Sequence, residues 1–239
     1  MNALQTHDCS LLKERANHLI GVDEAGRGCL AGPVFAAACL IELNLFKDSQ
    51  AVELTSEVND SKQLSAQKRE SVYAHLLLLR RSRLLHFAVA EASVAEIEAL
   101  NVLGATRLAM QRAVEKIESQ GDGWKLPPAE TGGPLFTTES SSVCLLVDGR
   151  PLRPFPYAHE GVVKGDAKSL AIAAAGIAAK VERDRRMGEL ASNYPQFGFD
   201  RHKGYGTLVH REEIAKHGAS PEHRRLFLRK ILSERPESV

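Results

Sequence analysis

The chain has 239 residues, of which 44% are hydrophobic and 26% are charged, with 31 Lys and Arg against 30 Asp and Glu. This length and composition indicate one large globular domain with a sizeable core, and they exclude disorder, collagen and a coiled coil. The longest apolar runs, such as residues 34–41 and 170–179, are far shorter than the ~20 residues of a membrane span. A net charge of +1 gives no overall attraction to nucleic acid, so local patches must hold any such partner.

Four apolar runs of strand length predict strands at residues 18–22, 34–41, 84–91 and 143–147. Helical spacing predicts helices from Ser65, as the N-cap, to about Arg81, and also at residues 105–119 and 169–191. Two shorter helical patterns follow at residues 208–217 and 221–232. Strands that alternate with helices are typical of an α/β sandwich built around a mixed sheet.

Two segments differ from the rest in composition. Residues 119–142 contain 14 Gly, Pro, Ser or Thr among 24 residues, which predicts a flexible surface insertion. Residues 201–235 contain nine Lys or Arg and four Asp or Glu, which makes this tail the one clearly basic part of the chain.

The N-terminus and the cysteines indicate the compartment. The first twenty residues carry charges and no apolar block, so they are not typical of a signal peptide, and we expect a cytoplasmic protein. The four cysteines have neither the CxxC spacing nor the His partners of a zinc site, so we expect them to be reduced and partly buried.

Acidic residues stand where predicted elements begin or end. Asp23 and Glu24 follow the first strand, Asp148 follows the fourth, and Asp166 precedes the helix at 169–191. Ligands of α/β sheets bind beyond the carboxyl ends of strands, so these acids are candidates to converge. Clustered carboxylates without His or Cys favour Mg²⁺ or Mn²⁺ over Zn²⁺, as in two-metal phosphoryl chemistry. Taken singly, each acid is more often a local turn residue, and that alternative remains open.

The glycine-rich stretch at residues 26–31 has the spacing of a dinucleotide-binding fingerprint, G-x-G-x-x-A. That fingerprint must open a helix, whereas Gly32-Pro33 and a strand-like run follow here. Residues 21–28 also resemble a P-loop in spacing. However, Arg27 stands where the P-loop needs its lysine, and Gly28 stands where it needs a metal-binding Ser or Thr hydroxyl. Glycines on both sides of Arg27 would instead let backbone N–H groups approach a phosphate or a sugar.

The chain resembles the ribonuclease HII family in several motifs that occur in the family's order. They are GVDEAGRG at 21–28 with LAGPV at 30–34, DSKQL at 60–64, DG at 148–149, VKGDAK at 163–168, the Ala-rich helix with VERDR at 173–185, and HKGYGT at 202–207. The resemblance implies a ribonuclease H-like α/β fold, a mixed five-stranded sheet flanked by helices. It assigns a catalytic domain to residues 18–195 and a small, basic, helical C-terminal extension to residues 196–239.

The activity that the resemblance implies is a metal-dependent endonuclease. It would cut the RNA strand of RNA–DNA hybrids, including single ribonucleotides embedded in duplex DNA, and leave 5′-phosphate and 3′-hydroxyl ends. The expected partners are these nucleic acids and no membrane, and we expect a monomer. A non-catalytic module that only binds hybrids is the alternative, but four anions serve no purpose in a groove for phosphates unless metals neutralise them.

Motif positions also imply roles for single residues. Asp23, Glu24, Asp148 and Asp166 correspond to the family's four metal-binding acids, which would hold Mg²⁺ or Mn²⁺. Gly26, Arg27 and Gly28 match the segment that reads the ribose 2′-OH, and Tyr205 matches the aromatic residue that stacks at the RNA–DNA junction. Lys62, Lys164 and the basic tail would neutralise phosphates, although single lysines are usually only solvated surface residues.

Three further residues are expected to lie outside this machinery. Gly176 stands where the family usually carries Ser, and we expect it to loosen its helix without touching a catalytic motif. His202 and His210 are expected at the surface, because a metal-bound water needs no additional base.

Overall fold

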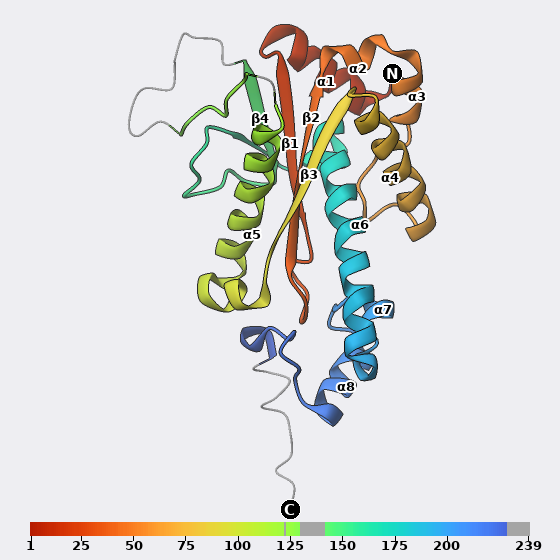
Figure 1. Ribbon diagram of the computed structural model, residues 1–239, viewed down its shortest axis with the longest axis vertical. Coiled ribbons are helices and arrows are strands. Elements are labelled where there is room, and N and C mark those ends of the chain that lie inside the picture. Colours follow the sequence, from red (N-terminus) through yellow and green to blue (C-terminus); the bar gives the residue numbers. More distant parts are fainter. Residues whose placement is uncertain (122, 130–141, 229–239) are drawn as a thin grey trace, which may run out of the picture.

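The computed structural model describes residues 1–121, 123–129 and 142–228, and these residues contain a five-stranded mixed sheet in the order β3-β2-β1-β4-β5 (Figure 1). Its strands are β1 (His18–Ala25), β2 (Val34–Glu42), β3 (Leu85–Ala92), β4 (Val143–Asp148) and β5 (Glu160–Val162). β1 pairs antiparallel with β2 and parallel with β4. The predicted mixed sheet is confirmed, and all four strands expected from apolar runs are present.

The helices and 3-10 turns pack around this sheet. They are α1 (Ala3–Glu14), α2 (Leu43–Lys47), α3 (Ser49–Leu54), α4 (Ala66–Arg81), α5 (Val94–Ser119), η1 (Gly165–Ala167), α6 (Leu170–Asn193), η2 (Pro195–Phe197), α7 (Phe199–His202) and α8 (Leu208–His217). Ser65 caps α4 as expected, because its side chain accepts a hydrogen bond from the Lys68 N–H. The structure adds α1, α2 and α3, which no sequence pattern predicted.

Each face of the sheet buries its own apolar cluster. Leu19 of β1 packs among side chains of α4 and α6, whereas the next residue, Ile20, packs among side chains of α5 on the other face. β1 also touches the backbone of α6, since a Cβ atom at Gly21 would lie 2.2 Å from the Ile172 nitrogen. Only glycine permits such an approach, which brings the end of β1 close to α6.

α5 begins earlier than expected and bends. The sequence predicts a helix at residues 105–119, but α5 starts at Val94 behind a capping box formed by Ser93 and Glu96. Asn101 interrupts it with φ 58°, and its side chain accepts hydrogen bonds from the N–H groups of Leu103 and Gly104. Asn101 therefore acts as a second N-cap inside the helix, which divides the periodic pattern into two shorter parts.

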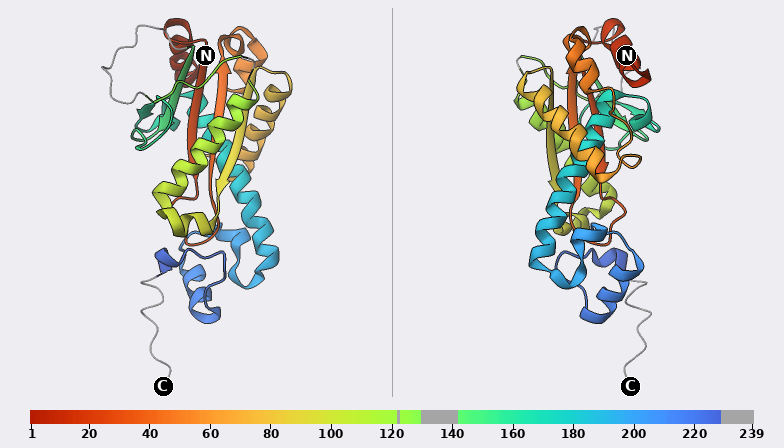
Figure 2. Two further views of the ribbon diagram at one scale, coloured as in Figure 1. Left: turned by 60° about the vertical axis from the view of Figure 1, so that its left-hand side comes forward. Right: turned by 90° about the vertical axis from the view of Figure 1, so that its right-hand side faces the viewer.

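The C-terminal residues gather beyond the end of the sheet. α6 runs past the sheet, and η2, α7 and α8 pack near its far end, as Figures 1 and 2 show. A third apolar cluster that includes Met187, Phe197, Phe199 and Ile214 holds this part together. The helix expected at 221–232 is confirmed at residues 225–228 and wrong in its first residues, which form a turn and a β-bridge. Residues 229–232 lie outside the described part. The division after residue 195 stays a prediction.

The segment at 119–142 is only partly described, since residues 122 and 130–141 lie outside the described residues. The expectation of a surface position is wrong for its start, because Trp124 and Leu126 are buried and belong to the cluster beneath α5. The Trp124 ring lies 5.5 Å from the His18 ring, centroid to centroid.

Two other expectations can be compared with the described residues. All four cysteines are free and buried, as the sequence predicts. Among the helices that the structure describes, none combines the length and the apolar character needed to cross a bilayer.

Candidate active site

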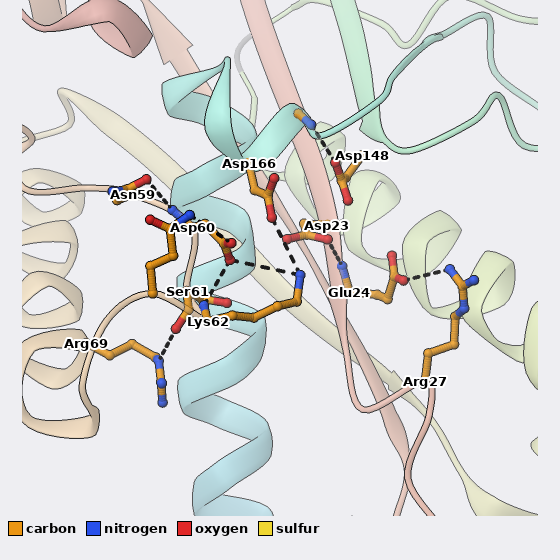
Figure 3. Close-up of polar contacts among 12 residues, drawn as sticks. Asp23, Glu24, Arg27, Asn59, Asp60, Ser61, Lys62, Arg69, Asp148 and Asp166 are labelled. Carbon is orange, nitrogen blue, oxygen red and sulfur yellow. Dashed lines mark hydrogen bonds and ion pairs between the residues drawn. The ribbon is translucent and has the colours of Figure 1, made fainter.

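Three carboxylates converge where strands β1 and β4 end beside α6 (Figure 3). Parallel pairing of Val22 with Val147 places Asp23 of β1 next to Asp148, the last residue of β4. Asp166 comes from η1, directly before α6. One oxygen atom from each carboxylate lies within 4.8 Å of the others. Three of the four acids that the resemblance singled out thus form one group.

Backbone N–H groups fix two of these carboxylates. The Gly165 N–H donates to Asp148 Oδ1 at 2.7 Å, which joins β4 to η1. The Glu24 N–H donates to Asp23 Oδ1, also at 2.7 Å. Lys164 adopts φ 56° to turn the chain into η1. Asp23 and Asp148 are therefore held in place by the main chain.

The three acids repel one another, and within the described part of the chain only Lys62 forms an ion pair with one of them. Asp23 is buried, and burial together with the charges of Glu24 and Asp148 raises its pKa well above the usual range. Burial and Asp148 also raise the pKa of Asp166. A cluster of oxygen ligands without His or Cys fits a hard divalent cation such as Mg²⁺ or Mn²⁺. Such a cation would remove the repulsion.

Glu24 points away from the other three acids. Its Oε1 accepts a hydrogen bond from Arg27 Nη1 at 2.9 Å, and Figure 3 shows both side chains turned from the Asp23 carboxylate. Burial raises the pKa of Glu24, while the Arg27 guanidinium acts against that shift. The role of Glu24 as a metal ligand stays a prediction.

Lys62 lies at the edge of the acidic group. Its Nζ is 3.5 Å from Asp166 Oδ2 and 4.0 Å from Asp60 Oδ1, and its side chain is 76% exposed. The loop that carries it is fastened by Arg69, whose Nε donates to the Ser61 carbonyl. Lys62 is thus placed between solvent and the acids. Lys164 is exposed two residues before Asp166.

Gly176 contacts the acidic group, which corrects the expectation that it touches no catalytic motif. A Cβ atom at this position in α6 would lie 2.3 Å from Asp23 Oδ2. The missing side chain leaves the space that the Asp23 carboxylate occupies. The effect of this glycine is therefore on the site as well as on helix stability.

Tyr205 lies on the loop between α7 and α8 and is 42% exposed. Lys180 Nζ is 5.5 Å from the centre of its ring and Arg183 Cζ is 6.0 Å from it, both within reach of a cation–π interaction. The Leu30 N–H donates to the Gly204 carbonyl at 2.8 Å, which ties the tyrosine loop to the glycine-rich loop. The ring is therefore partly exposed, with two cationic side chains near it.

The histidines near Tyr205 correct the expectation that His202 and His210 lie at the surface. His210 is fully buried, and the His202 ring, which is half-buried, stacks on it at 4.2 Å. His210 Nδ1 donates to the Tyr205 carbonyl, so its Nε2 is the acceptor for His223 Nε2–H at 3.1 Å. Burial lowers the pKa of both His210 and His223 to about 4. These histidines support the tyrosine loop in their neutral form.

Sequence patterns missed several residues that organise the site. Asp184 joins Lys180 at 2.6 Å and Arg69 at 3.4 Å, and so links α6 to α4 beside Tyr205. The buried Arg183 and Arg224 hold backbone carbonyls of the glycine-rich stretch. Lys180, Arg183 and Asp184 lie in the motif at 173–185, but that motif alone assigns them no contacts.

Two carboxylates at the ends of β1 and β4 and a third from η1 form a group that suits the hydrolysis of phosphodiesters with divalent cations. The family model described as Ribonuclease HII matches residues 20–126 and 155–230. The chain belongs to the ribonuclease HII family, whose members are metal-dependent endoribonucleases that cleave the RNA strand of RNA–DNA hybrids. Asp148 lies between the two matched segments, so its place in the site rests on the geometry.

Individual relatives agree with this assignment. A ribonuclease HII of Albidiferax ferrireducens is 45% identical over 91% of this chain and 89% of its own, and one of Magnetococcus marinus is 43% identical over 92% and 90%. The ribonuclease H2 of Pyrococcus horikoshii has a TM-score of 0.61 at 24% identity, covering 90% of this chain and 97% of its own. RNase HII from Archaeoglobus fulgidus, solved in a complex with PCNA, has a TM-score of 0.64 at 20% identity, covering 92% and 98%. These structures confirm the fold.

Proposed function

We propose that this enzyme cleaves at single ribonucleotides embedded in duplex DNA as well as in longer RNA–DNA hybrids, by two-metal catalysis. The observation that carries the proposal is the group formed by Asp23, Asp148 and Asp166 at the end of β1 and β4. Products with 5′-phosphate and 3′-hydroxyl ends follow from attack of water on the phosphorus with the 3′-oxygen as leaving group.

The metal-binding acids would be these three aspartates together with Glu24. When bound, divalent cations, Mg²⁺ or Mn²⁺, supply water activation and stabilisation of the leaving oxygen. The chain itself fixes Asp148 and Asp23 through the Gly165 and Glu24 N–H groups before any ligand arrives. Glu24 now pairs with the exposed Arg27 side chain, which could also contact a substrate phosphate.

Recognition of a ribonucleotide would come from the backbone of residues 26–28. A 2′-OH is the one group that distinguishes a ribonucleotide from its deoxy neighbours, and a site built to bind it rejects the deoxy analogue strongly. This loop directly follows Asp23 and Glu24 on the chain, so the sugar it reads would lie near the scissile phosphate. Gly26 has φ 89°, a conformation that suits glycine.

The remaining assignments concern the nucleic acid around that sugar. Tyr205 would stack at the RNA–DNA junction, since its ring is partly exposed next to the glycine-rich loop. Lys62 and Lys164 would contact phosphates. Both are exposed; Lys62 pairs with Asp166, and Lys164 comes two residues before it in sequence. We further propose a monomer with a catalytic domain at 18–195 and a basic extension at 196–239. We also propose that it works in the cytoplasm, where RNA–DNA hybrids and ribonucleotide-containing DNA would be its substrates.

A comparison of substrates tests this function. The purified enzyme is assayed with Mg²⁺, Mn²⁺ or EDTA on a continuous RNA–DNA hybrid, on a DNA duplex with one ribonucleotide, and on the same duplex without it. We expect cleavage of the first two substrates only, and only with metal. Cleavage of the hybrid but not of the single-ribonucleotide duplex would overturn the proposed specificity.

A further inference from the structure

Residues 222–224 of the C-terminal extension lie directly against the glycine-rich loop, although about two hundred residues separate them in sequence. The Gly32 N–H donates to the Glu222 carbonyl, and the Arg224 N–H donates to the Leu30 carbonyl, both at 2.8 Å. Between these bonds, Ala31 and His223 form an antiparallel bridge. The extension therefore pairs with the loop as a short added strand does.

The Arg224 side chain extends this contact to the ribose-reading residues. It is fully buried, with Nε donating to the Gly32 carbonyl at 2.9 Å and Nη1 donating to the Arg27 carbonyl at 3.0 Å. One rigid guanidinium thus spans the loop between Arg27 and Gly32. Arg183 holds the next stretch through the Ala31 and Pro33 carbonyls.

Pairing with an acidic side chain does not explain this arginine. Among the described residues, no carboxylate forms an ion pair with Arg224, and its Nη2 is buried without a hydrogen-bond partner. Burial lowers the pKa of Arg224 to about 10, which shows that the charged form is disfavoured there. An apolar residue of similar size would remove that cost, but it would leave the Gly32 and Arg27 carbonyls without this donor. What an apolar residue cannot do is hold two carbonyl groups at a fixed separation.

We propose that Arg224 is a positioning residue for ribonucleotide recognition, which sets the backbone of residues 26–28 by holding the Arg27 carbonyl. This inference rests on the proposed role of that loop in reading the 2′-OH. It makes the C-terminal extension part of sugar discrimination, in addition to any contact of its basic side chains with phosphates. The side chain of Arg27 is engaged by Glu24, so the residue is held from both sides.

Two substitutions separate position from charge. Arg224→Lys keeps the charge but replaces two fixed guanidinium donors with one rotatable ammonium group. Arg224→Met removes both the charge and the donors. Arg225→Ala is the matched control, because Arg225 is the next residue and is exposed. For each protein, dissociation constants are measured in EDTA for two DNA duplexes that differ only in one ribonucleotide, and their ratio gives the ribose preference.

We expect the wild-type protein to bind the ribonucleotide duplex more tightly. In both Arg224 variants the preference should fall by about threefold to tenfold, the value of one well-placed hydrogen bond, while affinity for the all-DNA duplex stays the same. Arg225→Ala should weaken both duplexes alike and keep the ratio. Amide hydrogen exchange of residues 26–32 should be faster in Arg224→Lys than in the wild type.

The outcomes distinguish this inference from the proposed function. A wild-type preference that Arg224→Lys retains, with unchanged amide exchange in the loop, would overturn the positioning role and leave the proposed function standing. Absence of any ribose preference in the wild type would overturn the proposed reading of the 2′-OH and the inference with it. If circular dichroism shows that Arg224→Lys does not fold, Arg224→Gln takes its place and the same ratio decides.

Discussion

Gly176 of α6 faces Asp23 of β1 so closely that a Cβ atom at position 176 would lie 2.3 Å from Asp23 Oδ2. The same two elements already touch at Gly21 and Ile172, so neither backbone can move away easily. The orientation of the Asp23 carboxylate is therefore limited by a helix that contributes no side chain at this point.

Gly176→Ala should weaken metal binding. The added methyl group must displace the Asp23 carboxylate, and overpacking of a buried site costs about 1–3 kcal/mol. Ala gains only about 0.5–1 kcal/mol over Gly in a helix, so we expect a net loss of stability as well. Calorimetric titration with Mn²⁺ measures the affinity directly. Gly188→Ala is the control, because nothing lies within 4 Å of a Cβ atom there. Wild-type affinity in Gly176→Ala would show that Asp23 has room to adapt.

Asp148→Asn should fold normally and lose cleavage by at least about 100-fold, since it removes a charge from the metal-binding group without changing side-chain size. The Asn oxygen can still accept the Gly165 N–H, so the local structure is kept. Relief of repulsion with Asp23 and Asp166 should leave the metal-free melting temperature unchanged or raise it. A large fall in melting temperature would mark Asp148 as a structural residue instead.

The buried pair His210 and His223 should make the C-terminal extension sensitive to acid. The pKa of each is lowered from 6.5 to about 4 in the folded protein. Below pH 6.5 the unfolded chain therefore binds more protons than the folded protein. Stability is then fully present above pH 6.5 and is lost as the pH falls towards 4, by on the order of 3 kcal/mol for one group. Urea unfolding at several pH values should show a shallower loss in His223→Gln. If stability depends on pH identically in the wild type and in His223→Gln, the buried histidines are not the cause of the acid sensitivity.

Tyr205→Ala should impair cleavage at a lone ribonucleotide more than cleavage of a continuous hybrid. Stacking of a base on an aromatic ring is worth about 1–3 kcal/mol, and a contact with the sugar should lie near the lower end. Tyr205→Phe keeps the ring and should retain most activity. By comparison, Lys62→Ala should weaken all duplexes alike and reduce the salt dependence by about one unit of slope. Equal losses on both substrates for Tyr205→Ala would show that the ring does not read the junction.

The sequence predicted those parts of the fold that have a strong local pattern. Apolar runs located four strands, and Ser65 marked the start of α4. β5 was not visible as a pattern, because it has only three residues and its burial does not alternate. α1 was missed because its sequence is largely polar, although Asn2 and Gln5 form a capping box.

In the candidate site, too, the sequence predicted the residues that have a local signal and missed the contacts between distant elements. The acids were found because each stands at the end of a local element, and the chain brings three of them together. Arg224 was placed only within a basic tail, since nothing near it in sequence shows that its partner is the Arg27 carbonyl. His210 was expected at the surface because its burial depends on aromatic residues and His223 from other elements. Contacts of this kind carry no periodic signal.

Cleavage of one DNA duplex that contains a single ribonucleotide, with the ends of the products mapped, tests the central claim most directly. With Mg²⁺ or Mn²⁺ the wild-type enzyme should cut only at the ribonucleotide and leave a 3′-hydroxyl and a 5′-phosphate, and neither EDTA-treated enzyme nor Asp148→Asn should cut appreciably. Cleavage that persists in EDTA, or that leaves a 2′,3′-cyclic phosphate, would contradict a metal-dependent attack by water at the site of Asp23, Asp148 and Asp166.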